Sequence, residues 1–468
     1  MSQGRLSEQS GRAGAAGRQP IRRAWTRRTP ARQQPATATG WQQGALSGGQ
    51  SEAPVSGARR RRLGLALLGA TLLLAGCAPL TLPGPVVLYV AISTMGDEPV
   101  TRHSAQLFHS RFRTLVQGFQ RIHPDVVVQL SVYREEQLLA QIRHRERSGL
   151  GPDLIITTSD QANALLSNRL IQPIPQSPQL RDAIDPTLLR LVTDRRGRIS
   201  AQPQGIYTQL ACYDRRKLPR APKTVDELLA ASAAGARVGL ALRLRDLFWS
   251  AGSLGALPAI RKADQGGVPD PREMEGLRQW IRWLQNAESQ SRLTFVEADT
   301  TLRDSFQRGK LDWISCRSSD LSQLQQALGP RLGISALPDG EGFRAAPVNQ
   351  LRVMALGRGS SRRQRTMALA LASYGVSPLV QRNLTLENLS FLPVNRHVSV
   401  PERYSHVLTA MQEARSQTAA GSGTVLANLH AADPRIGPLR QVIVPAVFGQ
   451  MTPAAAADRI VKILRRQR

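Results

Sequence analysis

The chain has 468 residues, of which 41% are hydrophobic, so it can bury the cores of two or three domains or of one protein with two lobes. Its formal net charge of +28 first suggests a nucleic-acid-binding protein. However, residues 1–76 hold 12 of the 62 Lys and Arg and 2 of the 34 Asp and Glu, which leaves 50 basic and 32 acidic residues, or +18, on the rest. The remaining charge is not interleaved with aromatic residues and matches no nucleic-acid-binding motif, so nucleic acid is not the expected partner.

Residues 1–58 are rich in Gly, Ala, Gln, Ser and Arg and have no regular apolar spacing. That composition is typical of disorder, and we predict a disordered basic extension. One hypothesis is that translation starts further along, for instance at Val55 if its codon is GTG. Peptides from residues 1–50 in mass spectrometry of the precursor would refute that hypothesis.

Residues 59–76 have the pattern of a signal peptide. Four arginines, Arg59–Arg62, precede an apolar run from Leu63 to Leu74, which is too short for a helix across a bilayer of about 30 Å. The end of this run, Leu74-Ala75-Gly76-Cys77, resembles the bacterial lipobox. The resemblance implies that Cys77 becomes a lipidated N-terminus. The protein is therefore expected in the cell envelope, anchored on the periplasmic or extracytoplasmic face of a membrane.

The chain contains three cysteines, Cys77, Cys212 and Cys316, and no Cys-x-x-Cys pair. Because the histidines are also sparse and scattered, no metal site is expected. If lipidation consumes Cys77, the other two cysteines form an even pair that can make a disulfide in an oxidising compartment. Two buried free thiols are the alternative that we favour, because the sequence does not supply the distance that a disulfide requires.

After a linker over residues 77–85, apolar strands alternate with helices. We predict strands at Val86–Ile92, Val126–Val132 and Pro152–Ile156, and helices at Phe112–Ile122, Glu136–Ser148 and Asp160–Asn168. This order indicates an α/β fold with a mostly parallel sheet and helices on both faces. Ligands of such sheets bind at the carboxyl ends of the strands, where the loops Ser93–Asp97 and Thr157–Asp160 lie.

A series of short passages then follows in a fixed order along the chain. It comprises the helix end His123-Pro124-Asp125, the segments Gly151–Ile155, Asn168–Ile174, Ala211–Asp214, Leu218–Leu229, Phe306–Lys310, Ile334–Gly340 and Leu392–Val394, and the closing helices Leu439–Phe448 and Thr452–Leu464. The ordered set resembles the extracellular solute-binding proteins of ABC importers, family 1, in the cluster of maltose- and other sugar-binding proteins. The resemblance covers nearly all of residues 86–464.

The resemblance implies a bilobed periplasmic-binding-protein fold of type II, with the ligand in a cleft between two α/β lobes. It assigns residues 86–205 and 333–391 to lobe 1, and residues 206–332 and 392–468 to lobe 2. Ligand contacts with both lobes would favour their closure. No enzyme activity and no cofactor are implied, because ATP is handled by a separate subunit. The sequence agrees, since it has no GxSxG, HExxH or Gly-rich phosphate loop.

Mapping onto the family pattern gives candidate ligand-binding residues in the loops. They are Ser93, Asp97, Thr158, Asp160, Tyr207, Asp246, Trp249, Arg317, Ser318 and Ser319. Carboxylates suit the hydroxyls of a sugar and aromatic faces suit its C–H surface. Trp249 could instead be a packed helix residue, and Asp160 only the cap of its helix. Trp280, Trp283 and Trp313 are expected in the core.

Two features differ from the maltose-type pattern. Arg317-Ser318-Ser319 replaces Gly-Pro-Trp, and Arg435-Ile436-Gly437 lies near a C-terminal helix without the stacking aromatic. With 6 Trp, 6 Tyr and 9 Phe in all, a long stacking groove for maltodextrin is not expected. A small polyol, a compact disaccharide or an anionic solute fits better. Arg317 and Arg435 would favour an acidic ligand if they faced the cleft, but we favour solvated surface arginines.

The sequence leaves three functions open. The first is a lipid-anchored, monomeric substrate-binding protein that delivers a sugar or polyol to the permease of an ABC importer. The second is a basic surface lipoprotein that binds an acidic solute or polymer, which salt-dependent binding would reveal. The third is an enzyme or regulatory partner that reuses the fold, although no residue demands it.

Overall fold

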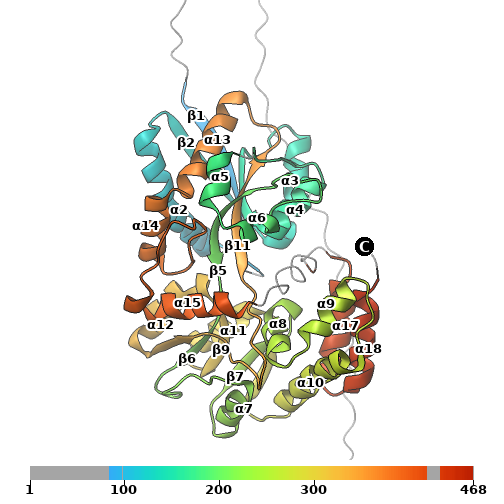
Figure 1. The fold of residues 1–468 in the computed structure, drawn as a ribbon. Helices are drawn as coiled ribbons and strands as arrows, with labels where there is room; N and C mark the ends of the chain where they lie inside the picture. The colour runs from blue at the N-terminus through green and yellow to red at the C-terminus, as the bar shows by residue number, and fades with distance from the viewer. Residues whose placement is uncertain (1–83, 97, 176, 419–428, 430–432, 467–468) are drawn as a thin grey trace, which may run out of the picture. The chain divides into compact units, whose positions relative to one another are not determined.

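The structure is a computed structural model that describes residues 84–96, 98–175, 177–418, 429 and 433–466 (Figure 1). All of these belong to one unit of the chain, Thr81–Arg468. The extension of residues 1–58, the signal peptide, Cys77 and Asp97 lie outside the described residues. Among the helices that are described, none has both the length and the apolar character needed to cross a membrane.

The first sheet has six strands in the order β2-β1-β3-β11-β4, with β5 also paired to β11. The strands are β1 (Val86–Ser93), β2 (Val126–Tyr133), β3 (Leu154–Thr158), β4 (Ile171–Gln172), β5 (Gln202–Tyr207) and β11 (Gln350–Gly357). β1 runs parallel to β2 and β3, whereas β11 runs antiparallel to its three neighbours. The predicted parallel core of this sheet is therefore confirmed, and the returning strand β11 completes it.

The helices of this first lobe are α2 (Arg102–Ile122), α3 (Leu138–Arg147), α4 (Ser159–Ser167), α5 (Pro178–Ala183), α6 (Pro186–Leu191), α13 (Arg362–Gly375) and α14 (Pro378–Asn388), with a 3₁₀ turn η1 (Glu135–Gln137). α13 and α14 lie beside α2, and α3 lies beside α4 (Figure 1). α2 begins ten residues before the predicted start, because Thr101 and Ser104 form a capping box. Sequence periodicity missed that start, since the first turns are mostly polar.

The second sheet has five strands in the order β10-β6-β9-β7-β8. The strands are β6 (Gln209–Asp214), β7 (Val238–Ala241), β8 (Leu293–Val296), β9 (Trp313–Arg317) and β10 (Leu332–Ser335). β6 runs antiparallel to β9 and β10, and β7 runs parallel to β8 and β9. The predicted boundaries between the lobes are therefore displaced. Residues 333–335 pair with β6 in the second sheet, and Ile206–Tyr207 pair with β11 in the first sheet.

The helices of this second lobe are α7 (Val225–Ala233), α8 (Leu244–Ser253), α9 (Leu257–Asp264), α10 (Pro271–Glu288), α11 (Asp299–Gln307), α12 (Leu321–Leu328), α15 (His406–Gln417), α17 (Ile436–Val447) and α18 (Pro453–Leu464). Three 3₁₀ turns, η2 (Ser318–Asp320), η3 (Gly329–Arg331) and η4 (Glu402–Tyr404), complete the described elements. α10 begins at Pro271 behind a capping box of Asp270 and Glu273, as residue preferences at helix starts would suggest. The two closing helices confirm the predicted ones to within a few residues.

Tryptophans form the centre of the second core. Trp249, Trp280 and Trp313 are fully buried, and Trp283 is 6% exposed. The ring of Trp249 lies 6.3 Å from that of Trp283 and 6.1 Å from that of Trp313. The core positions predicted for Trp280, Trp283 and Trp313 are confirmed. Trp249 is packed in this core and lines neither of the two cavities described below, which supports the alternative of a packed helix residue over a ligand contact.

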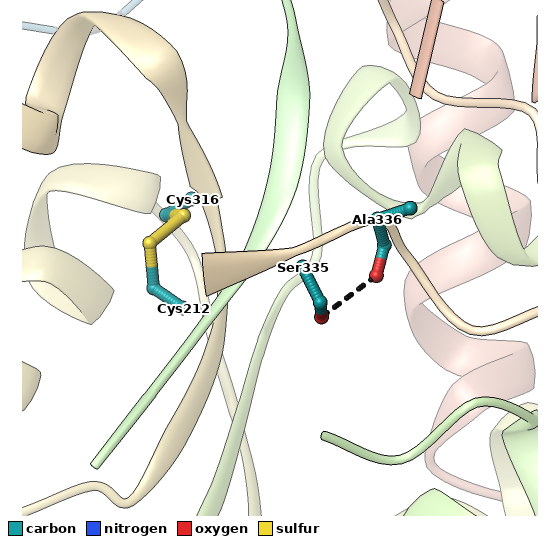
Figure 2. The surroundings of a disulfide bond; sticks show 4 residues. All are labelled: Cys212, Cys316, Ser335 and Ala336. Atoms are coloured by element: carbon teal, nitrogen blue, oxygen red, sulfur yellow. Dashed lines mark hydrogen bonds between the residues drawn. A yellow bond between two sulfur atoms is a disulfide. The ribbon is translucent and has the colours of Figure 1, made fainter. Parts of the chain in front are cut away.

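A disulfide joins Cys212 on β6 to Cys316 on β9, with Cα atoms 5.8 Å apart (Figure 2). The register of these antiparallel strands pairs Cys212 with Ile314, two residues before Cys316. Residues two apart point to the same face, so the cysteines are diagonal neighbours. The free thiols that we favoured from the sequence are therefore corrected to a disulfide.

Candidate ligand-binding site

A small cavity lies where β5 passes into β6, and we call it the hinge cavity. Its walls come from the loop after β1, the β5–β6 connection, α8, β9 and the start of β11. The lining residues are Met95, Tyr207, Thr208, Gln209, Arg245, Asp246, Arg317, Val348 and Gln350. Its volume is about 10 Å³, room for one water molecule. Both lobes therefore contribute side chains to one enclosed space.

Five of these side chains have a buried polar atom without a hydrogen-bond partner among the described residues. The atoms are Thr208 Oγ1, Arg245 Nε, Asp246 Oδ2, Arg317 Nη1 and Gln350 Oε1. Buried polar atoms nearly always have a partner, and an unsatisfied one costs about 1–3 kcal/mol. The set offers two N–H donors, two acceptor oxygens and one hydroxyl that can serve as either. It is therefore suited to groups that both donate and accept hydrogen bonds.

Arg317 lies at the centre of the hinge cavity, at the end of β9. Its Nη2 is 2.9 Å from Asp246 Oδ1 and 2.7 Å from Asp299 Oδ2. Burial acts to lower the pKa of Arg317, but the Asp299 and Asp246 carboxylates raise it above its ordinary value, so the guanidinium stays charged. Burial raises the pKa of Asp246, although Arg317 opposes that shift. The solvated surface position that we favoured for Arg317 is thus wrong, and its charge is already balanced by carboxylates.

The loop after β1 brings the first lobe against Arg317. Gly96 has a φ of +64°, and a Cβ at this position would collide with Arg317 Nη1. The Gly96 N–H donates to Glu135 Oε2 at 2.6 Å, and Thr158 Oγ1 donates to Glu135 Oε1 at 3.2 Å. Glu135 thus holds the glycine in place. Burial and the nearby charge of Asp160 raise the pKa of Glu135, and Arg245 partly offsets them.

Three arginines link the two lobes around the hinge cavity. Arg245 Nη1 on α8 lies 3.2 Å from Asp160 Oδ2 on α4. Arg303 on α11 lies 3.2 Å from Asp320 and 3.8 Å from Glu98 in the first lobe. Burial raises the pKa of Glu98, and Arg303 partly offsets that shift. In the opposite direction, Arg111 on α2 donates to the carbonyl oxygen of Ser319 at 2.9 Å. Charged and polar groups thus join the two lobes around this cavity.

The predicted site residues divide into three groups. Tyr207, Asp246 and Arg317 line the hinge cavity, and Ser319 lines a smaller cavity beside it. Asp160 and Thr158 do not line the hinge cavity but contact residues at it or beside it. Asp160 pairs with Arg245, and Thr158 donates a hydrogen bond to Glu135. The capping role considered for Asp160 is wrong, because Thr158 is the N-cap residue of α4 and the Asp160 side chain makes an ion pair.

The remaining predicted residues hold the framework. Ser318 Oγ donates to the carbonyl oxygen of Ser390 and accepts from the Thr208 N–H. Ser93 Oγ lies 3.1 Å from Thr157 Oγ1 and accepts from Arg352. Sequence reasoning missed the cavity residues Met95, Thr208, Gln209, Arg245, Val348 and Gln350 and their neighbour Glu135. Glu135 follows the carboxyl end of β2, so the strand-end rule could have found it.

Arg435 is neither in the cavity nor solvated, so both alternatives drawn from the sequence are wrong. It is 6% exposed, lies 3.0 Å from Asp264 and 2.9 Å from Asp433, and donates to the carbonyl oxygen of Leu464. These bonds connect α9, α17 and α18. Across the described residues, no cluster of three His, Cys, Asp or Glu side chains could hold a metal ion.

Comparisons with known proteins agree with this arrangement. The sequence model of a family described as bacterial extracellular solute-binding protein matches residues 114–407. No curated protein sequence matches the chain.

Solved structures share the fold at low sequence identity. The GacH receptor of Streptomyces glaucescens GLA.O, solved unliganded and with acarbose, is 19% identical, with a TM-score of 0.64 over 82% of this chain and 100% of its own. A solute-binding protein of an ABC transporter from Thermotoga lettingae TMO, bound with α-D-tagatose, is 15% identical, with a TM-score of 0.62 over 81% and 100%. The maltose-maltodextrin binding protein of Alicyclobacillus acidocaldarius is 14% identical, with the same TM-score and coverage. The type II bilobed fold is thus confirmed.

Proposed function

The chain belongs to the bacterial extracellular solute-binding proteins, and on that premise we propose that it is the substrate receptor of an ABC importer. It captures a sugar or polyol in the hinge cavity and delivers it to a permease whose ATPase is a separate subunit. The lipobox resemblance at Cys77 supports a lipid anchor on the extracytoplasmic face. The sugars named for proteins of the same fold support the ligand class.

The single observation that carries the ligand class is the set of unpartnered atoms in the hinge cavity. A sugar hydroxyl donates one hydrogen bond and accepts others, so a few hydroxyls can satisfy all five atoms. A carboxylate or phosphate could pair only with the donors and would leave Asp246 Oδ2 and Gln350 Oε1 unsatisfied. Arg317 is already neutralised by Asp246 and Asp299, so the cavity holds no spare positive charge there for an anion.

The present volume of the hinge cavity sets a condition on binding. A space of about 10 Å³ holds one water molecule and excludes a sugar ring. The ligand therefore enters when the lobes separate and the contacts of Met95 and Gly96 with the second lobe are released. Hydroxyls then replace those contacts, and contacts to both lobes draw the lobes together.

Thermal unfolding of the purified protein against sugars, polyols and organic anions tests the proposal. A ligand at 100 times its Kd should stabilise the folded protein by about 2.7 kcal/mol. Asp246→Asn should weaken binding of the same sugar by roughly tenfold or more, because it alters a hydrogen bond to a charged group. Asp226→Asn is the matched control, since Asp226 is exposed in the first turn of α7 and does not line the hinge cavity.

Two results would contradict the proposed function. One is stabilisation by organic anions alone. The other is a sugar affinity that Asp246→Asn leaves unchanged. The anchor is tested separately, because Cys77→Ser should release the protein from the membrane fraction whatever the ligand is.

A further inference from the structure

A second cavity lies inside the first lobe, beneath α2 and α14, and we call it the lobe-1 cavity. Its volume is about 120 Å³. Its floor is the row Ile92, Ile156 and Met354, which are neighbours in register on β1, β3 and β11. The helices and the segment after α14 supply further apolar side chains, Phe108, Phe112, Leu115, Leu384 and Phe391. The space is therefore lined largely by hydrocarbon.

One charged group, Arg352, is buried at this cavity. It is 7% exposed and donates to the side chain and carbonyl oxygens of Ser93. No ion pair joins it to a carboxylate of the described residues, although Tyr207 and Glu135 partly offset the effect of burial on its pKa. Two other arginines of low exposure differ in this respect, because Arg317 and Arg435 each contact two aspartates.

A buried guanidinium without a counterion is unfavourable, because desolvation is not repaid by a partner charge. Burial accordingly lowers the pKa of Arg352 below its ordinary value. Other polar side chains of the lobe-1 cavity are already hydrogen-bonded, and Arg111, which also lines it, donates to the carbonyl oxygen of Ser319. Gln381 donates to the carbonyl oxygens of Gln204 and Gly375 and accepts from the Val394 N–H, and Gln204 donates to Ala372. The polar requirement that remains is an anion at Arg352.

We propose that the lobe-1 cavity binds a small apolar carboxylate whose carboxylate group pairs with Arg352. A guanidinium holds a carboxylate with two parallel hydrogen bonds, and the hydrocarbon walls receive the apolar body. An engineered apolar cavity of about 150 Å³ accepts benzene, so about 120 Å³ suits one aromatic ring or a short alkyl chain. This site goes beyond sugar capture and does not depend on it.

The lobe-1 cavity adjoins the hinge cavity. Met95 and Tyr207 line both spaces, so they form a shared wall. The Tyr207 ring also lies 5.8 Å from the ring of Phe391, on the lobe-1 side. A carboxylate in the lobe-1 cavity would therefore contact Met95 and Tyr207 from one side, and a sugar in the hinge cavity would contact them from the other.

Methyl NMR of the methionine side chains tests the proposal with benzoate as the probe and benzyl alcohol as its uncharged counterpart. Met354 forms part of the cavity floor, whereas Met274 on α10 packs against the core of the second lobe. At pH 7 benzoate should shift the Met354 methyl signal in a saturable manner and leave Met274 unchanged. Benzyl alcohol should bind at least tenfold more weakly, because it lacks the charge that Arg352 requires.

Two variants sharpen the test. Arg352→Gln should reduce the affinity for benzoate by roughly ten- to a hundredfold while changing that for benzyl alcohol by less than about threefold. Leu384→Trp should fill the cavity and abolish both shifts. An unchanged signal of Met367 on α13, which packs against the core of the first lobe outside the cavity, verifies that each variant is folded. The wild-type comparison of the two probes remains valid if a variant is not folded.

The proposal is overturned if saturating benzoate leaves Met354 unshifted in the wild-type protein. It is also overturned if benzoate and benzyl alcohol bind equally well, or if Arg352→Gln leaves benzoate affinity unchanged. Failure here is distinct from failure of sugar capture, which is read from sugar-induced stabilisation and from Asp246→Asn.

Discussion

Reduction of the Cys212–Cys316 disulfide should destabilise the protein strongly. The bond closes a loop of 104 residues that contains α7 to α11 and the strands β7 and β8. In the chain-entropy account, a crosslink across about 100 residues restricts the unfolded chain enough to contribute about 4.7 kcal/mol of stability. Both cysteines are buried, so reduction leaves two apolar thiols in place and isolates the effect of the crosslink.

Urea unfolding with and without a phosphine reductant, followed by tryptophan fluorescence, measures this loss. Trp249, Trp280, Trp283 and Trp313 lie in the core of the second lobe and report on its unfolding. The double variant Cys212→Ala/Cys316→Ala is the control, because its unfolding should not respond to the reductant. Binding should weaken as well, since Arg317 directly follows Cys316 at the hinge cavity.

The reasoning fails if thiol labelling shows that both cysteines are reduced and the free energy of unfolding nevertheless changes by less than about 1 kcal/mol. That outcome would mean that the reduced, unfolded chain is as restricted as the oxidised one. The register of β6 and β9 would then be maintained only by the backbone hydrogen bonds between these strands and by the packing of the hydrophobic core.

Three further perturbations test the site and its framework. Gly96→Ala should lower the free energy of unfolding by more than Gly149→Ala in urea titrations, because both alter a positive φ but only Gly96 faces the guanidinium in the hinge cavity. Burial raises the pKa of Glu135 in the folded protein, so the contribution of this side chain to stability is greatest below pH 4.5 and is lost as the pH rises through the folded value. In unfolding measurements from pH 4.5 to 8, the free energy of unfolding of Glu135→Gln should therefore increase relative to that of the wild type. Arg435→Met should cost about 3–5 kcal/mol in urea unfolding, because it removes the guanidinium that pairs with two buried carboxylates. Arg440→Met, which breaks an exposed pair, should change little.

The first half of the first sheet was predictable because its strands are continuous β-branched runs. Val86–Ile92 and Val126–Val132 read as buried strands, and their alternation with helices dictates parallel pairing. The second crossing between the lobes was not predictable. β10 is only four residues long, and its place beside β6 depends on a partner more than a hundred residues earlier.

The candidate site was predictable only where its residues lie at the ends of strands or in the loops that the family resemblance assigns to the cleft. Tyr207, Asp246 and Arg317 were found in this way. The sequence could not decide whether an arginine is solvated, because that depends on carboxylates brought from other elements. Asp299 reaches Arg317 from α11, and Asp264 reaches Arg435 from α9. Trp249 was predicted on a helix near a loop, and that position was compatible either with contact to a ligand or with burial in the hydrophobic core.

The contacts between the lobes lead to a last prediction, which concerns Glu98. Its carboxylate lies 3.8 Å from Arg303 of the second lobe, and both side chains are largely buried. Such a contact stabilises the arrangement that the ligand completes, so its loss raises the cost of bringing the lobes together. Apparent affinity falls in proportion to the population of the competent state.

Glu98→Gln should therefore weaken sugar binding without touching the sugar. An ion pair of this kind is worth on the order of 1 kcal/mol, so the expected loss is roughly fivefold in Kd. Glu136→Gln, at an exposed carboxylate beside Arg134, is the control. An equal or tighter Kd for Glu98→Gln in calorimetric titration would show that the contact between the lobes opposes capture, and the lobes would then have to break it before closing on the ligand.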